Sequence, residues 1–391
     1  MNLSKIKRAS SRLLVRYVPA VGTLLLTKVL LDSYSAEDYA RFALVTSFAA
    51  LIPVLDLGGG TKAVLVSGNL RQTSSLVLAP LLLSLLFGAA WLVSGAQIVL
   101  NVFLVSIPTA LYIVARANYA YDGADDFNRR AMILYPLGFL LIYAVLQLER
   151  SWAPAAAGLF VMYFALIAGS RPRYVMAVMR RIVLRLKWRD ALPEPANFRL
   201  VLLSGISFAG VFSNVAYLEH FGTAAEVQTY DLIWRMLSVT LFAQLYLAHS
   251  FPDVVRKLSN RNAATNKQTF YRLMQIAIIL TIAQTIVAAL IFPFYASYFG
   301  FELNWAEVGA GLFLCIVFSM IIPVNQVMMA TARFNNLIVL FMSSAALANV
   351  IKFQLPPTAQ NAFFSSALGY VLVLVAGSFV ILREGTKMRA P

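Results

Sequence analysis

The chain has 391 residues, of which 60% are hydrophobic and 13% are charged, and its net charge is +15. A soluble protein carries about 25% charged residues, whereas runs of about 20 apolar residues recur along this chain. Composition therefore excludes a soluble globular protein and predicts an all-α polytopic membrane protein. The positive charge does not indicate nucleic-acid binding, because the cations cluster between the expected spans, where membrane topology accounts for them.

Twelve transmembrane helices are expected, six on each side of one long polar interruption. This interruption, residues 171–198, carries seven cations and two acids, and Pro193 and Pro195 end any helix within it. Its Lys/Arg excess predicts a basic cytoplasmic linker. The expected domains are an N-terminal six-helix lobe at 1–170, this linker, and a C-terminal six-helix lobe at 199–391. The expected spans are 13–32, 40–62, 73–94, 98–117, 131–147, 153–170, 199–219, 229–250, 271–295, 307–330, 336–354 and 361–382.

The distribution of Lys and Arg places both termini in the cytoplasm. In this orientation the inner tails, loops and helix ends hold 27 of the 32 cations, and the outer loops hold only Arg150 and Lys352. The other three, Lys28, Arg41 and Arg235, fall inside spans. This asymmetry follows the positive-inside rule, and the basic N-terminus is interpreted as a retained first helix. The acids of the outer loops are Asp32, Glu37, Asp38, Glu149, Glu219, Glu226, Glu302 and Glu307.

A faint internal repeat relates the two halves. The stretch LLDSYSAEDYARF at 30–42 resembles YLEHFGTAAEVQTYDLIW at 217–234, with an acid at the end of a span, a short outer loop and a following Tyr. The inner loop at 118–130 likewise resembles 328–337. Both matches join the same ordinal helices, and both halves start on the inner face, so the repeat is parallel.

Four stretches carry a resemblance to a known family. They are AEDYARFALVTSF at 36–48, VLDLGGGTKAVLV at 54–66, VQTYDLIWRMLSV at 227–239 and AHSFPDVVRKLS at 248–259. With twelve spans in two parallel lobes, the chain resembles the Wzx-type polysaccharide flippases. These belong to the MOP superfamily, the larger group that includes lipid II flippases and MATE-type multidrug exporters.

The resemblance implies both an architecture and a cargo. It implies a V-shaped, MATE-like pair of bundles in the bacterial inner membrane, moving an undecaprenyl-pyrophosphate-linked oligosaccharide outward by alternating access for O-antigen or exopolysaccharide synthesis. Its implied partners are that lipid-linked oligosaccharide, the bilayer and other polysaccharide-assembly membrane proteins. No bond is made or broken in this process, so we expect no enzyme, no catalytic residues, no metal and no cofactor.

Two cations inside the spans are the candidate substrate ligands. Lys28 lies in the outer half of the first expected helix, and Arg235 lies about two turns into the eighth. A cation at the centre of a span costs about 2.5–3.5 kcal/mol on the insertion scale. The resemblance implies that both helices line the central cleft, where an Arg fork and a Lys point charge suit a pyrophosphate.

The same two cations each have an acid four residues away. Asp32 follows Lys28 and Asp231 precedes Arg235, so each cation can pair along its own helix. Structural neutralisation, contact with a substrate headgroup, and ion or proton coupling therefore remain open as roles. These roles are not exclusive, because a pair can open when an anion arrives.

Three further residues complete the candidate set. Arg41 is close enough to the outer surface to snorkel, and Trp234, beside Arg235, is placed to stack on a sugar or on the cation. Asp56 precedes three glycines near the inner end of a span, where it is interpreted as a gate residue or as a snorkelling helix end.

Two rival functions follow from the same composition. A MATE-like drug/cation antiporter would need acids deep in the cleft, whereas the deepest charges expected here are Lys28 and Arg235. A membrane-embedded polysaccharide polymerase or ligase generally works through a large outer loop, and none is found.

Overall fold

The structure is a computed structural model of the whole chain. It describes residues 24, 25, 27–57, 73–106, 159, 202, 206, 210, 211, 213–239, 258, 263–302, 304–331 and 333–387. All regular structure in this part of the chain is helical, without a strand. Its long helices are α2 (Ala36–Leu57), α4 (Thr73–Ser94), α11 (Ala224–Val239), α13 (Ala263–Phe299), α14 (Trp305–Ala330), α15 (Phe334–Gln354) and α16 (Ala359–Lys387).

The chain divides into two compact units. The first takes residues 1–64 and 69–201, and the second takes 65–68 and 202–391. The linker predicted at 171–198 lies outside the described residues, so the division into two six-helix lobes around it stays a prediction. The twelve-span count and the position of the termini also stay predictions.

In the first unit, a helix through Ser33 is followed by a tight turn and α2. Ser35 caps α2, because its Oγ accepts from the Asp38 backbone N–H at 3.2 Å and donates to Asp38 Oδ2 at 3.1 Å. Serine at the cap and an acid three residues later are a helix-start signature. The helix therefore begins at Ala36, before the predicted 40, and Glu37 and Asp38 occupy its first turn rather than a loop.

The described core of the first unit joins α2, α4 and the helix Gln97–Ser106. Val45, Val102 and Val105 are buried together, with Phe48 and Phe87 meeting edge to face at 6.4 Å between ring centroids. The bounds of α4 agree with the predicted span at 73–94. Gly95 ends this helix with a φ of +63°, which only glycine adopts at little cost, and its N–H donates to Trp91 O.

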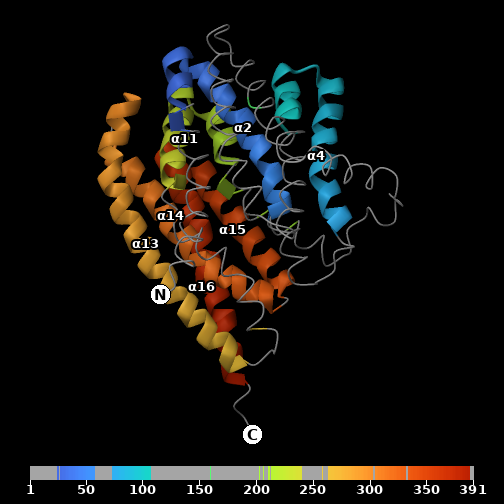
Figure 1. Cartoon of the computed structure of the whole chain (residues 1–391), viewed down its shortest axis with the longest axis vertical. Coiled ribbons are helices and arrows are strands. Elements are labelled where there is room, and N and C mark those ends of the chain that lie inside the picture. The colour runs from blue at the N-terminus through green and yellow to red at the C-terminus, as the bar shows by residue number, and fades with distance from the viewer. Residues whose placement is uncertain are drawn as a thin grey trace, which may run out of the picture. The chain divides into compact units, whose positions relative to one another are not determined.

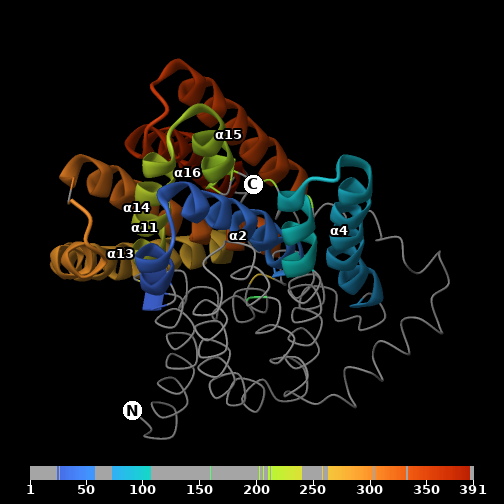
Figure 2. The same ribbon diagram turned by 90° about the horizontal axis from the view of Figure 1, so that it is seen from above.

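The second unit is built around α16. This helix packs against α14 on one side and α15 on the other, while α13 packs against α14 (Figures 1 and 2). The short α11 contacts α13, α14 and α16. A glycine permits the approach of α11 to α14, because a Cβ at Gly311 would lie 2.8 Å from Leu237 Cδ1 and 2.9 Å from Ile233 Cγ2.

Four described helices are long and apolar enough to cross a membrane. They are Asn266–Phe299, Trp305–Ala330, Phe334–Gln354 and Ala359–Arg383. Three of them start two residues before the predicted spans, and α13 begins at Ala263 instead of 271. Hydropathy detects only the apolar part of a helix, whereas α13 begins with polar turns that carry Asn266, Lys267 and Gln268.

Lys352 corrects the count of outer-loop cations. It lies in the last turn of α15 and is 2% exposed, so it is a buried helix residue rather than a loop residue. Its Nζ lies 5.3 Å from the centroid of the Tyr217 ring. A lysine stem can follow apolar surface and a ring face can hold the ammonium, which is why a cation is tolerated here.

Candidate functional site

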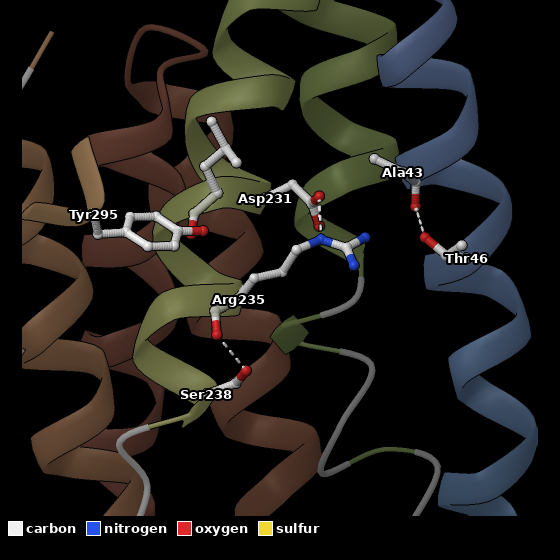
Figure 3. A network of polar contacts seen from close by, with 7 residues as sticks. Ala43, Thr46, Asp231, Arg235, Ser238 and Tyr295 are labelled. Atoms are coloured by element: carbon white, nitrogen blue, oxygen red, sulfur yellow. Dashed lines mark hydrogen bonds and ion pairs between the residues drawn. The ribbon is translucent and has the colours of Figure 1, made fainter. Parts of the chain in front are cut away.

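A pair on α11 is the most buried ion pair in the described part of the chain. Arg235 Nε lies 2.6 Å from Asp231 Oδ2, and the two side chains are 15% and 7% exposed (Figure 3). The four-residue spacing places both groups on one face of the helix. Because the carboxylate is almost fully buried, its charge depends on the guanidinium for compensation.

Hydrogen bonds to neighbouring backbone carbonyls hold this part of α11 in place. The Tyr295 hydroxyl of α13 donates to Leu232 O at 3.1 Å, and Ser238 Oγ donates to Arg235 O at 2.6 Å (Figure 3). Figure 3 also shows a similar internal bond in α2, from Thr46 Oγ1 to Ala43 O at 3.0 Å. The bond from Tyr295 fixes α11 against the long α13 at the level of the ion pair.

A second buried polar cluster, centred on Asn214, ties α11 to α16. Asn214 Nδ2 donates to the Tyr230 hydroxyl at 3.0 Å, to Ser366 Oγ at 2.9 Å and to Ala362 O at 3.2 Å. The Tyr230 and Ser366 hydroxyls in turn donate to the backbone carbonyls of Val211 and Gly210, each at 3.2 Å. The helix that contains Asn214, α11 and α16 are thereby joined through one hydrogen-bonded chain.

A ring contact also belongs to the Asn214 cluster, and one of the cluster's polar atoms has no hydrogen-bond partner among the described residues. The Tyr230 ring stacks on Phe363 at 4.3 Å between centroids. Asn214 Oδ1 is buried and has no hydrogen-bond partner among the described residues. Sequence reasoning missed this cluster, although an Asn within the apolar run VFSNVAYL is a signal, since buried polar groups in spans need partners.

The start of α16 is capped from another helix. Glu226, in the first turn of α11, accepts a hydrogen bond from the Ala359 backbone N–H at 2.6 Å. A carboxylate at a helix N-terminus satisfies a donor that lacks an intrahelical partner and interacts favourably with the helix dipole. Glu226 is therefore a clamp between α11 and α16, and not the outer-loop acid that was expected.

Lys28 forms the corresponding pair in the first unit. Its Nζ lies 2.6 Å from Asp32 Oδ1, and the side chains are 27% and 57% exposed. This pair is more exposed than the pair on α11, so its partners depend less on each other. Whether Lys28 and Arg235 face each other across a cleft stays a prediction, because each belongs to a different unit.

The repeat places the two pairs at different positions. Ser35 caps α2, and Thr223 Oγ1 accepts from the Glu226 N–H at 3.3 Å in the equivalent turn before α11. Lys28 lies on the helix before its turn, whereas Arg235 lies on the helix after it. In the repeat predicted from the sequence, the two cations would therefore not occupy equivalent positions.

The other candidate residues from the sequence are Arg41, Trp234 and Asp56. Arg41 Nη1 lies 3.9 Å from Asp38 Oδ1 and its side chain is 53% exposed, and its role as a snorkelling residue stays a prediction. Trp234 is half-buried, and its stacking on a sugar or on Arg235 stays a prediction. Asp56 falls in the last turn of α2, but its side chain is not among those that the structure describes. Within the described ranges, no group of three His, Cys, Asp or Glu side chains could hold a metal.

Comparison with known proteins supports the fold. No family model matches the chain, and no curated protein matches it. An inward-facing multidrug resistance MATE family transporter of the MOP superfamily matches with a TM-score of 0.64 and 14% identity, over 95% of this chain and 96% of the other. A MATE in complex with MaL6 matches with a TM-score of 0.65 and 12% identity, over 96% and 94%.

These structures define the class of fold. An outward-facing MATE family transporter of the MOP superfamily also matches, with a TM-score of 0.60 and 12% identity, over 96% of this chain and 94% of the other. The chain is a multi-pass membrane protein with a fold like that of the MATE transporters. At such low identity the likeness concerns the fold alone, so the cargo must be argued from the residues.

Proposed function

We propose that the chain is a transporter that moves a polyprenyl-pyrophosphate-linked oligosaccharide across the bacterial inner membrane. The lipid tail would remain in the bilayer while the headgroup passes between the two lobes. The identity of the lipid carrier and the role in O-antigen or exopolysaccharide synthesis come from the sequence resemblance. No covalent step is involved, so the chain would not be an enzyme.

The observation that carries this proposal is the buried Arg235–Asp231 pair on α11 in a chain with a transporter fold. A buried ion pair is weak support for stability, because desolvation offsets much of the attraction between its partners. A functional reason for keeping the guanidinium there is therefore worth testing. An anionic headgroup would replace Asp231 as a partner of Arg235 when the pair opens.

A pyrophosphate headgroup requires a cationic ligand on α11 rather than an acidic one. Pyrophosphate presents closely spaced anionic oxygens, which match the planar fork of an arginine. The polar contacts from Tyr295 and the Asn214 cluster would keep α11 rigid while the side chains rearrange. Lys28 would be the counterpart in the first unit.

The alternative function is a cation-coupled drug or solute antiporter. It is favoured by the solved structures that share the fold, two of which are described as multidrug resistance transporters. In that case Asp231, and not Arg235, would be the ligand, since an acid can hold a cationic drug or a coupling ion. A membrane-embedded polymerase or ligase has no such support.

Deleting the chain from its native cell separates these functions. Loss of surface polysaccharide with accumulation of the lipid-linked precursor, and unchanged susceptibility to cationic dyes, is the expected result. Restoration by the wild-type chain, with weaker restoration by Arg235→Ala at equal protein level, would complete the support. Intact polysaccharide with increased dye susceptibility would instead identify the antiporter.

A further inference from the structure

Lys352 is a buried cation for which the described part of the chain provides no anion. It is the only charged residue of α15, and its side chain is among the largest that are almost fully buried. Within the described part of the chain, no ion pair or hydrogen bond reaches its Nζ. An isolated buried ammonium is unfavourable unless a partner compensates its charge.

Two features of the fold compensate this charge in part. The Nζ lies 5.3 Å from the centroid of the Tyr217 ring, whose face carries negative potential. The Tyr217 hydroxyl donates to Lys352 O at 2.9 Å, which fixes the ring beside the lysine. The position of Lys352 in the last turn of α15 also suits a cation. None of these features supplies the formal negative charge that an ammonium pairs with best.

The lysine lies beside an aromatic cluster that reaches the surface. The Tyr217, Phe221 and Phe353 rings form a triangle, with centroids separated by 5.4, 5.5 and 5.6 Å. Phe221 is 53% exposed and Phe353 is 64% exposed. Aromatic side chains at the end of a spanning helix are typical of the level of the lipid headgroups.

An apolar stripe of α15 leads along the helix to this cluster. It consists of Val339, Met342, Val350 and Phe353, each more than half exposed, at spacings that keep them on one side of the helix. Such a stripe on a spanning helix accommodates an acyl chain. Its last residue, Phe353, follows Lys352, which lies on the buried side of α15 together with Ala348. A lysine that extends past Phe353 would bring its ammonium to the end of the stripe, where the headgroup of an anionic lipid would lie.

We propose that the end of α15 and the helix at 213–221 form a binding site for an anionic glycerophospholipid of the surrounding bilayer. The phosphodiester pairs with Lys352, which reaches it by extending past the exposed aromatic pair. The acyl chain lies on the α15 stripe. This inference does not depend on the proposed function, because the ligand carries neither a sugar nor a pyrophosphate.

Lipid binding to the purified full chain tests this site. Phosphatidylglycerol and phosphatidylcholine with identical acyl chains are titrated separately, and bound lipids are counted by native mass spectrometry. The wild type is expected to prefer phosphatidylglycerol, and Lys352→Met to lose about fivefold of this preference, the effect of one surface-level cation on an anionic lipid. Lys352→Arg should retain most of it.

Lys267→Met is the matched control. Lys267 also lies over a tyrosine ring, 5.9 Å from the Tyr271 centroid on α13, so the control removes the same charge from a similar contact. A preference unchanged in Lys352→Met, or lost equally in Lys267→Met, would overturn the proposal.

A second measurement keeps the proposal testable if Lys352→Met fails to fold. A photoactivatable phosphatidylglycerol is expected to label peptides that contain 213–222 or 350–354 of the wild type, and the phosphatidylcholine analogue to label them less. Equal labelling of these peptides by both lipids would refute the site.

Discussion

At the scale of single residues, the two ion pairs differ in how strongly their partners depend on each other. Asp231 is 7% exposed, whereas Asp32 is 57% exposed. Removing one partner of a buried pair costs about 3–5 kcal/mol, because the other charge is left uncompensated. Exposed pairs contribute about 0–1 kcal/mol.

The expected consequence is an unequal cost of the two alanine changes. Arg235→Ala should lower the thermal midpoint of the purified chain clearly, and Lys28→Ala should lower it only slightly. Thermal unfolding in one detergent measures both, with Arg41→Ala as a control whose partner is 3.9 Å away and exposed. Equal losses for the two variants would contradict the difference in burial.

Spacing along the chain shows which residue-scale features a sequence can predict. The pairs Lys28–Asp32 and Asp231–Arg235 lie within one helical turn, so their spacing alone indicated them. Asn214 meets Ser366 across 152 residues, and Tyr217 meets Lys352 across 135. Such contacts depend on how the helices pack, which local periodicity does not reveal.

At the scale of helices, some glycines allow two helices to approach closely, whereas other glycines face open space. A Cβ at Gly369 of α16 would lie 2.6 Å from Ser344 O of α15, a backbone atom that cannot move aside easily. A Cβ at Gly309 of α14 would meet nothing within 4 Å. Both substitutions by alanine gain the same helix propensity, about 1 kcal/mol.

Gly369→Ala is therefore expected to lower the thermal midpoint, since overpacking costs about 1–3 kcal/mol. Gly309→Ala should raise the midpoint or leave it unchanged, and this variant serves as the matched control. The comparison uses thermal unfolding of both purified variants. A midpoint for Gly369→Ala at or above the wild-type value would show that α15 and α16 do not pack as described.

The Glu226 clamp gives a second expectation at this scale. Glu226→Ala leaves the Ala359 N–H without its acceptor, which costs about 1–3 kcal/mol for a buried donor. Glu226→Gln retains an oxygen acceptor and loses only the charge at the helix end, about 0.3–1 kcal/mol. The thermal midpoints should rank wild type, Gln and Ala in descending order, and a reversed order of the two variants would contradict the clamp.

Helix ends were the least accurate part of the sequence prediction. The bounds of α4 agreed because Gly95 stops the helix where the apolar run ends. The starts of α2 and α13 were placed too late, because a hydropathy pattern does not register polar helical turns. The Ser35 and Thr223 capping signals would have corrected the ends of the outer loops.

At the scale of the whole molecule, the asymmetry of Lys and Arg predicts the orientation. Reporter fusions after Glu37, Gly222 and Glu302 should report outside, and fusions after Gly123 or Asn260 should report inside. The physical reason is that cations are retained on the cytoplasmic side during insertion. A reversed location for any of the five fusions would contradict the twelve-span topology.

The general fold was predictable, whereas the cargo was not. Apolar runs sufficed to predict a helical membrane protein, since twenty apolar residues in a bilayer must form a helix. The MATE-like architecture was implied by the family resemblance and not by these runs. In the proposed function, the specificity would depend on where Lys28 and Arg235 lie relative to each other. That arrangement depends on the packing of two units and on their movement, which leaves no periodic trace in the sequence.

The most direct test of the anionic cargo is export by double variants. Asp231→Asn with Arg235→Gln removes both charges of the buried pair, so protein abundance should recover relative to either single change. Lys28→Gln with Asp32→Asn does the same in the first unit. Surface polysaccharide is measured per unit of membrane-inserted protein. Normal abundance with strongly reduced export is the expected result, and full export by both double variants would contradict a cation-based headgroup site.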